Sequence, residues 1–370
     1  MGLEEEIEEL QREIRETKKN KATEGHLAKI KAKLRDKKLK AEKSPSSSGG
    51  GGGYGVRKSG DATVALVGFP SVGKSTLLNA LTNAESEVGE YEFTTLDVTP
   101  GMLHINGASV QVLDLPGLIK GAAVGRGRGR EVLSVVRIAD LVIFVLDAKH
   151  AQLYSTLTSE LYENHIRIDE IPPQIKIKRS DRGGISISHS VDLGLEESTI
   201  KGVLMEYGIV NADVTIREQL TIDRLIDGVM GNCVYKKSLV LINKSDSIDS
   251  SVFNSIHSSL VEKGVLSNNI IPLSAKVGSG LEGLKESIWD SLGFIRVYMD
   301  KPGRGIDYEE PLILVNGDSV KTACSKLGSD FLINFRFARI TGKSAKHDGQ
   351  LVGIDHVLLD GDVLRLITRR

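Results

Sequence analysis

The stretch Ala62-Thr-Val-Ala-Leu-Val-Gly-Phe-Pro-Ser-Val-Gly-Lys-Ser-Thr76 decides the fold. Residues 62–67 form a short apolar run, which is typical of a buried strand in a parallel sheet. Residues 68–75 match the pattern G-x-x-x-x-G-K-[ST] in full, and a helical pattern begins near Lys74. A strand, a glycine-containing turn and a helix in this order predict a phosphate-binding loop, because the backbone N–H groups at the start of the helix point at an anion.

Each position of this loop has a predicted role. Gly68 and Gly73 allow the backbone to approach phosphate closely, Lys74 reaches the terminal phosphates as a catalytic group, and the Ser75 hydroxyl ligates Mg²⁺. The alternative, a chance glycine-rich turn, is disfavoured by four fixed positions in the right context. The predicted phosphate-binding residues of the loop are Gly68, Phe69, Pro70, Ser71, Val72, Gly73, Lys74, Ser75 and Thr76.

A second phosphate element ends an apolar strand 40 positions after Lys74 and reads Asp114-Leu115-Pro116-Gly117. Asp114 is predicted to hold Mg²⁺, directly or through water, and the Gly117 N–H to sense a γ-phosphate as part of the catalytic machinery. All four residues are assigned to the phosphate site.

Phe93-Thr94-Thr95 lies between these two elements. A GTPase needs a threonine there whose hydroxyl reaches Mg²⁺ only when the γ-phosphate is present. We assign Thr95 as the metal ligand and catalytic residue, although spacing does not distinguish it from Thr94. A plain surface loop is the alternative.

Two further motifs follow apolar strands and predict a guanine pocket. In Asn243-Lys244-Ser-Asp246, the Asp246 carboxylate can accept both N–H donors of guanine, Asn243 can brace the loops, and the Lys244 stem can cover the base. Ser274-Ala275-Lys276 follows the next strand, and its backbone can donate to the guanine oxygen.

Strands that alternate with helices indicate an α/β fold with a mostly parallel sheet and helices on both faces. We assign residues 61–292 to this domain. The 96 positions from Asp147 to Asn243 exceed one crossover unit, so about 168–236 is predicted to be an inserted α+β subdomain. Within it, 174–179 and 184–189 look like a β-hairpin around Asp181-Arg-Gly, and helical patterns cover 196–207 and 216–230.

The N-terminal part is strongly polarised in charge. Residues 1–43 predict two helices in a hairpin, and residues 44–60 form a Gly/Ser-rich flexible linker. Residues 1–16 carry a net charge of −5 and residues 17–58 one of +10. Either this is a solvated helix face, or the basic segment grips RNA or an acidic partner.

Composition and net charge restrict the class of protein and its compartment. The net charge is only −1, two cysteines make no disulfide framework, and no apolar run is long enough to span a membrane. The cytoplasm is the expected compartment. Residues 293–370 predict a compact C-terminal domain of short strands, with Trp289 and Phe294 as core between it and the preceding helix.

The motifs GFPSVGKS, YEFTTLDVTPG, DLPGLIKGAAVGRGRGREV and NKSD resemble those of the Obg-like GTPases, and within them the developmentally regulated GTP-binding proteins. The resemblance covers nearly the whole chain. It implies a P-loop G domain, an N-terminal helical hairpin, an insertion and a C-terminal TGS domain of β-grasp form. It also implies Mg²⁺-dependent GTP hydrolysis, a role in translation through ribosomes or RNA, and a zinc-finger partner protein.

The chain departs from other GTPases at two positions. Leu118 stands where Ras-like GTPases have the glutamine that orients water, so slow intrinsic hydrolysis is expected. Potassium-stimulated Obg-like relatives have Asn where this loop has Ser71, a difference that argues against potassium stimulation. K⁺ stays a second candidate cofactor besides Mg²⁺. Arg126, Arg128 and Arg130 either contact RNA or phosphate or form a solvated loop. A nucleotide-gated binding module and an ATPase are the alternative functions, although Asp246 disfavours the ATPase.

Overall fold

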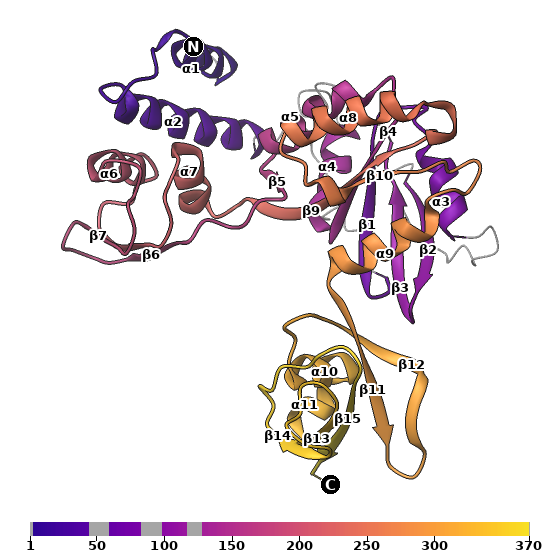
Figure 1. The fold of residues 1–370 in the computed structure, drawn as a ribbon. Helices are drawn as coiled ribbons and strands as arrows, with labels where there is room; N and C mark the ends of the chain where they lie inside the picture. Colours follow the sequence, from indigo (N-terminus) through magenta and orange to yellow (C-terminus); the bar gives the residue numbers. More distant parts are fainter. Residues whose placement is uncertain (1–2, 44–58, 83–97, 117–127, 370) are drawn as a thin grey trace. The chain divides into compact units, whose positions relative to one another are not determined.

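The computed structural model describes residues 3–43, 59–82, 98–116 and 128–369. The chain forms two compact units, each built from two separate stretches of the sequence. Unit 1 joins residues 1–53 with residues 170–235, and unit 2 joins residues 54–169 with residues 236–370. Figure 1 shows the helices and strands of each unit.

The large sheet of unit 2 has the strand order β10-β9-β4-β1-β3-β2, with β5 also paired to β9. Five of its strands run parallel, and β2 is antiparallel to β3. The α/β fold with a mostly parallel sheet is therefore confirmed. The strands are β1 (Ala62–Val67), β2 (Thr99–Ile105), β3 (Ala108–Asp114), β4 (Leu141–Leu146), β5 (Ile166–Ile168), β9 (Val234–Ile242) and β10 (Ile270–Pro272).

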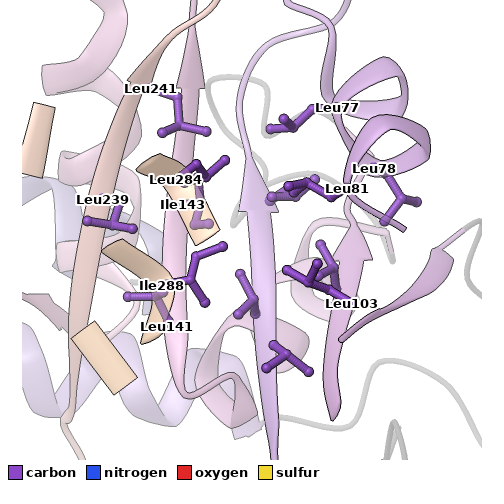
Figure 2. Packing of buried hydrophobic residues seen from close by; sticks show 14 of the residues in the cluster. Leu77, Leu78, Leu81, Leu103, Leu141, Ile143, Leu239, Leu241, Leu284 and Ile288 are labelled. Carbon is purple, nitrogen blue, oxygen red and sulfur yellow. The ribbon is translucent and has the colours of Figure 1, made fainter. Parts of the chain in front are cut away.

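Helices cover both faces of this sheet. Leucines of α3 (Lys74–Thr82) and α9 (Leu281–Leu292) share one apolar cluster with alternate residues of the central strands (Figure 2). Phe144 of β4 points to the other face, where its ring meets Tyr154 of α5 (Tyr154–Glu163) edge-on, with centroids 5.2 Å apart. Fully buried β1 and β4 explain why their sequences are apolar throughout rather than alternating. Two further helices are α4 (Arg128–Ile138) and α8 (Ser250–Glu262).

A two-residue hairpin turn joins β2 and β3. Asn106 and Gly107 both have positive φ, 47° and 87°, as a type I′ turn requires. This turn fixes β2 at the edge of the sheet beside β3.

The C-terminal part of unit 2 is a five-stranded sheet of order β12-β11-β15-β13-β14 with α10 packed against one face, the expected β-grasp arrangement. Phe294 packs into the core of the large sheet, and its ring lies 5.3 Å from Trp289, so these residues form the predicted core. The elements are β11 (Phe294–Lys301), β12 (Gly305–Val315), α10 (Val320–Leu327), α11 (Ser329–Ile333), β13 (Phe335–Thr341), β14 (Gln350–Val352) and β15 (Asp362–Thr368).

Unit 1 contains a three-stranded sheet that differs from the expected hairpin. β6 and β7 form at the predicted positions but do not pair with each other, because β8 lies between them. The prediction of a β-hairpin was therefore wrong. Alternation of apolar and polar residues along a strand shows which side chains share a face of the sheet, but it does not show which strand is the neighbour. Ile216, predicted as helical, belongs to β8. The elements are β6 (Ile175–Arg179), β7 (Ile185–His189), β8 (Ala212–Ile216), α6 (Glu197–Glu206) and α7 (Ile222–Met230).

The N-terminal helices α1 (Leu3–Glu16) and α2 (Glu24–Lys43) belong to this same unit. Ala28 and Ala32 of α2 enter the apolar cluster of α6, α7 and the small sheet. The Tyr207 hydroxyl donates to the Ala32 carbonyl at 3.2 Å. The predicted helical hairpin of α1 and α2 therefore packs against the insertion, about 170 positions away in sequence, and is not a separate domain.

The basic residues of α2 find acidic partners within unit 1. Lys31 pairs with Asp223 at 2.8 Å, Arg35 with Asp227, and Lys37 with Glu6 of α1. For these three residues, the acidic partner is therefore the chain itself.

None of the helices in the described residues is long and apolar enough to cross a membrane.

The Arg35–Asp227 pair should carry much of the docking energy of α2, since the two side chains are only 13% and 3% exposed. Arg35→Met leaves a buried carboxylate without this partner and should lower the opening free energy of α2 by about 3 kcal/mol. Hydrogen exchange of the α2 and α7 amides measures this. A double-mutant cycle with Asp227→Asn should give a coupling well above that of the exposed pair Lys201–Glu197, about 0.5 kcal/mol. Equal couplings for the two pairs would contradict the assignment.

Candidate nucleotide-binding site

All predicted site residues that the structure describes lie at one edge of the large sheet. The parallel strands β1, β3, β4, β9 and β10 end there, so the loops that follow them are neighbours. The ends of β1, β3, β9 and β10 carry predicted binding motifs, and the loop after β4 adds residues that the sequence did not single out.

The phosphate loop adopts a backbone that its glycines permit. Ser71 and Gly73 have φ angles of 63° and 97°, both in the left-handed region. A Cβ on Gly68 would lie 2.4 Å from the Val145 carbonyl oxygen, and one on Gly73 would lie 2.4 Å from Nδ2 of Asn243. Both glycines are therefore needed for packing inside the protein as well as for the approach of phosphate.

The Lys74 ammonium lies folded over this loop. Its Nζ donates to the carbonyl oxygens of Gly68 and Phe69 at 3.1 and 3.2 Å, and the residue is 8% exposed. Burial lowers the pKa of Lys74, whereas the nearby Asp114 carboxylate opposes that shift. A largely buried cation held by neutral carbonyls is an energetically favourable site for an anion such as phosphate.

Ser75 and Asp114 are in direct contact. The Ser75 Oγ donates to Oδ2 of Asp114 at 2.5 Å, whereas Oδ1 of Asp114 is buried and has no hydrogen-bond partner among the described residues. A hydroxyl oxygen and a carboxylate oxygen with spare acceptor capacity fit the hard-oxygen preference of Mg²⁺. Among the described residues, no three His, Cys, Asp or Glu side chains cluster as an all-protein metal cage.

The buried side chain of Asn243 joins three loops. Its Nδ2 donates to the Val72 carbonyl at 2.8 Å. Its Oδ1 accepts from the backbone N–H groups of Lys244 and Ala275 at 2.8 and 3.0 Å. The phosphate loop, the loop after β9 and the loop after β10 are therefore held together by one amide group, the bracing role expected of this residue.

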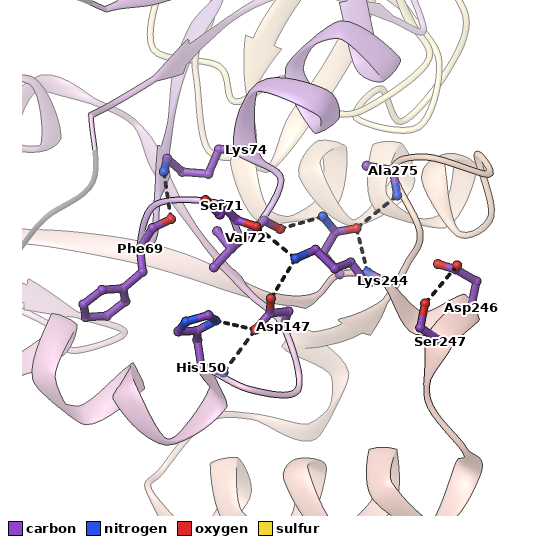
Figure 3. A network of polar contacts seen from close by, with 11 residues as sticks. Phe69, Ser71, Val72, Lys74, Asp147, His150, Lys244, Asp246, Ser247 and Ala275 are labelled. Carbon is purple, nitrogen blue, oxygen red and sulfur yellow. Dashed lines mark hydrogen bonds and ion pairs between the residues drawn. The ribbon is translucent and has the colours of Figure 1, made fainter.

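A second connection runs through Lys244, which has φ 60°. Its Nζ donates to the Ser71 carbonyl at 2.9 Å and pairs with Oδ2 of Asp147 at 2.9 Å. Oδ1 of Asp147 lies 2.6 Å from Nδ1 of His150, whose ring stacks on Phe69 with centroids 6.3 Å apart (Figure 3). Burial alone would raise the pKa of Asp147, but Lys244 and His150 hold it below its usual value.

Sequence reasoning missed the site positions of Asp147 and His150. A signal was present, since Asp147 directly follows the apolar strand β4 just as Asp114 ends the buried strand β3. For His150 there was no such signal, because nothing in its spacing along the chain places it beside Phe69.

The residues predicted to bind guanine also lie at this edge. Asp246 is exposed, and its pKa lies below its usual value, chiefly because the Ser274 hydroxyl hydrogen-bonds to the carboxylate. An ionised, solvent-facing carboxylate can accept two N–H donors from a base. Lys276 is exposed close by in the chain.

The remaining predicted residues divide into two groups. Phe69, Pro70, Thr76, Leu115 and Pro116 lie with the loops described above. Thr94, Thr95, Gly117, Leu118 and the side chains of Arg126, Arg128 and Arg130 lie outside the described residues, so their assignments stay predictions.

Asn243→Ala should weaken the site, because it removes three hydrogen bonds and leaves the Val72 carbonyl and the Ala275 N–H without them. We expect a loss of about 2–4 kcal/mol in stability and at least a tenfold weaker affinity for nucleotide. Calorimetric unfolding and nucleotide titration measure these effects. Asn269→Ala is the control, since it removes one bond to the Ser238 carbonyl away from the site. Equal nucleotide affinities for the two variants would contradict the bracing role.

Family models match three consecutive segments of the chain. Residues 63–179 match a family described as "50S ribosome-binding GTPase", and residues 182–294 match the C-terminal region of that domain. Residues 295–368 match the TGS domain. The G domain and the TGS domain of the predicted fold are thereby confirmed.

Curated relatives match over the full length. An uncharacterized GTP-binding protein of Halobacterium salinarum is 56% identical, with all of both chains covered. The developmentally-regulated GTP-binding protein 1 homolog of Dictyostelium discoideum and the developmentally-regulated GTP-binding protein 2 of Homo sapiens are each 40% identical, again with all of both chains covered. With its phosphate loop, its guanine motifs and its TGS domain, the chain belongs to the developmentally regulated GTP-binding proteins, a family of GTPases.

Proposed function

We propose that this protein is a Mg²⁺-dependent, GTP-hydrolysing switch that acts on the ribosome or its RNA, with a slow intrinsic rate. The observation that carries the nucleotide part is the bracing by Asn243, which holds the phosphate loop and both guanine loops in one array.

Mg²⁺ is proposed as the cofactor because Asp114 has a buried carboxylate oxygen free of hydrogen bonds beside the Ser75 hydroxyl. Ser75, Asp114 in part through water, and Thr95 would hold it. A bound Mg²⁺ neutralises charge on the β- and γ-phosphate oxygens.

The chain's own groups bind and orient the nucleotide. The loop N–H groups and Lys74 take the phosphates, and the Gly117 N–H is proposed to sense the γ-phosphate. Asp246 selects guanine, because a carboxylate without the base's paired donors is left unsatisfied.

Slow hydrolysis is proposed because Leu118 has no group that can orient the attacking water. A partner or a monovalent cation would then supply this function. Turnover compared in K⁺ and Na⁺ tests the cation, and equal rates would remove potassium as a cofactor.

The ribosome is the proposed target because the matched family is described as "50S ribosome-binding". A cytoplasmic location and a zinc-finger partner protein follow from the family resemblance and are proposed with it.

A second candidate function is a binding module in which nucleotide controls binding to RNA and hydrolysis is incidental. Leu118, which stands in place of glutamine, favours that candidate.

Purified ribosomes should raise the kcat of GTP hydrolysis severalfold, because the chain lacks its own water-orienting glutamine. Phosphate release with and without ribosomes measures this. Lys74→Ala is the control, since its loss should abolish turnover in both conditions. An unchanged kcat with tight GTP-dependent ribosome binding would favour the gated module instead.

Asp246→Asn should exchange guanine for xanthine specificity, because an amide can donate to the carbonyl that replaces the guanine amino group. We expect GDP affinity to fall by about 100-fold, roughly 3 kcal/mol, and XDP affinity to rise. Titration calorimetry with GDP, XDP and ADP measures both. Unchanged GDP affinity would show that Asp246 does not read the base.

A further inference from the structure

The three-stranded sheet of unit 1 has one covered and one uncovered face. Ile175, Ile177, Ile185 and Ile187 pack against the cluster of α6, α7 and α2. Figure 1 shows α6 and α7 on the same side of β6 and β7. Among the described residues of unit 1, no apolar cluster involves the other side. We call this other side the open face, and alternation along each strand assigns to it Lys176, Lys178, Ser186, Ser188, Asp213 and Thr215.

The register arranges these side chains in two rows across the sheet. Lys178, Asp213 and Ser186 form one row, and Lys176, Thr215 and Ser188 form the next. Arg217 directly follows β8 and continues the alternation, and its backbone N–H donates to the Gln174 carbonyl at 3.0 Å. The open face therefore presents three cations, three hydroxyls and one carboxylate.

These cations differ from those of α2. Lys31, Arg35 and Lys37 of α2 are paired within the unit. Lys176, Lys178 and Arg217 are exposed, and they form no ion pair within the part of the chain that the structure describes. Those three cations of α2 are already engaged within the unit, whereas the cations of the open face are available to an anionic partner.

The chemistry of the open face favours a nucleic-acid backbone over a protein. Protein interfaces are anchored by aromatic and apolar side chains, and the open face has none. Lysine, arginine and hydroxyl side chains are the groups that contact phosphate and sugar. Residues two apart on a strand are about 6.6 Å apart and neighbouring strands about 4.8 Å, so the cations spread along a strip that suits a polymer better than one small anion.

We infer that the open face, with Arg217, binds the phosphate backbone of RNA. This rests on the proposed action on ribosomal RNA and assigns a surface to it. Because no aromatic side chain on this face can stack on a base, binding there should depend on salt and hardly on sequence.

The test is the triple variant Lys176→Gln/Lys178→Gln/Arg217→Gln in the full chain. The probes are a fluorescein-labelled single-stranded RNA of about 20 nucleotides and a labelled RNA hairpin, titrated between about 50 and 200 mM salt. Removing three phosphate contacts should weaken binding at least tenfold at low salt and reduce the slope of log K against log salt by about 2. Basal GTP hydrolysis and the unfolding temperature should stay unchanged.

The matched control removes the same charge from unit 2 by Lys263→Gln/Lys321→Gln/Lys343→Gln, at three exposed positions on different elements. It should change affinity and salt slope far less. If the wild type binds RNA and the two triple variants lose affinity equally, the inference about the open face is wrong while the proposed function stands. If the wild type binds neither probe and no ribosomes, the proposed function fails as well. Retained RNA binding together with lost binding to poly-glutamate would assign the face to an acidic protein and overturn the inference.

Discussion

The nucleotide site depends on the hydrogen bonds of one buried amide, that of Asn243. A parallel sheet brings the ends of its strands to one edge, but loops of that kind do not hold one another in place. Asn243 donates to the phosphate loop and accepts from the loops after β9 and β10. Because Gly73 lies against the same Nδ2, a larger residue there would displace the amide. The loop predicted to bind phosphate and the loops predicted to bind guanine are therefore coupled through one side chain.

Ion pairs within the chain hold charged side chains in both units. The buried carboxylate of Asp147 pairs with Lys244 and His150 at the site. This pairing holds the Lys244 side chain against the Ser71 carbonyl of the phosphate loop. In unit 1, the basic helix α2 is matched by acidic residues of α1 and α7. The cations of the open face are exposed and form no ion pair with other described residues, so the near-zero net charge of the chain conceals a basic surface.

The position of the motifs in the fold could be predicted, because each has a fixed position relative to a strand or helix. The apolar runs around Gly68 and Asn243 placed both motifs at strand ends, and the sheet confirmed that arrangement. Sequence could not predict that β8 separates β6 from β7, since alternation carries no information about neighbours. Nor could it predict that Ala28 and Ala32 pack on the insertion, or that His150 meets Phe69, because these contacts join distant parts of the chain.

The most direct test of the account is nucleotide-dependent hydrogen exchange. Adding GDP with Mg²⁺ should protect three loops together, residues 68–76, 243–246 and 274–276, while the same concentration of ADP should protect none of them strongly. That result would show one guanine-specific site braced by Asn243. Protection by ADP equal to that by GDP, or protection of the phosphate loop alone, would contradict the account.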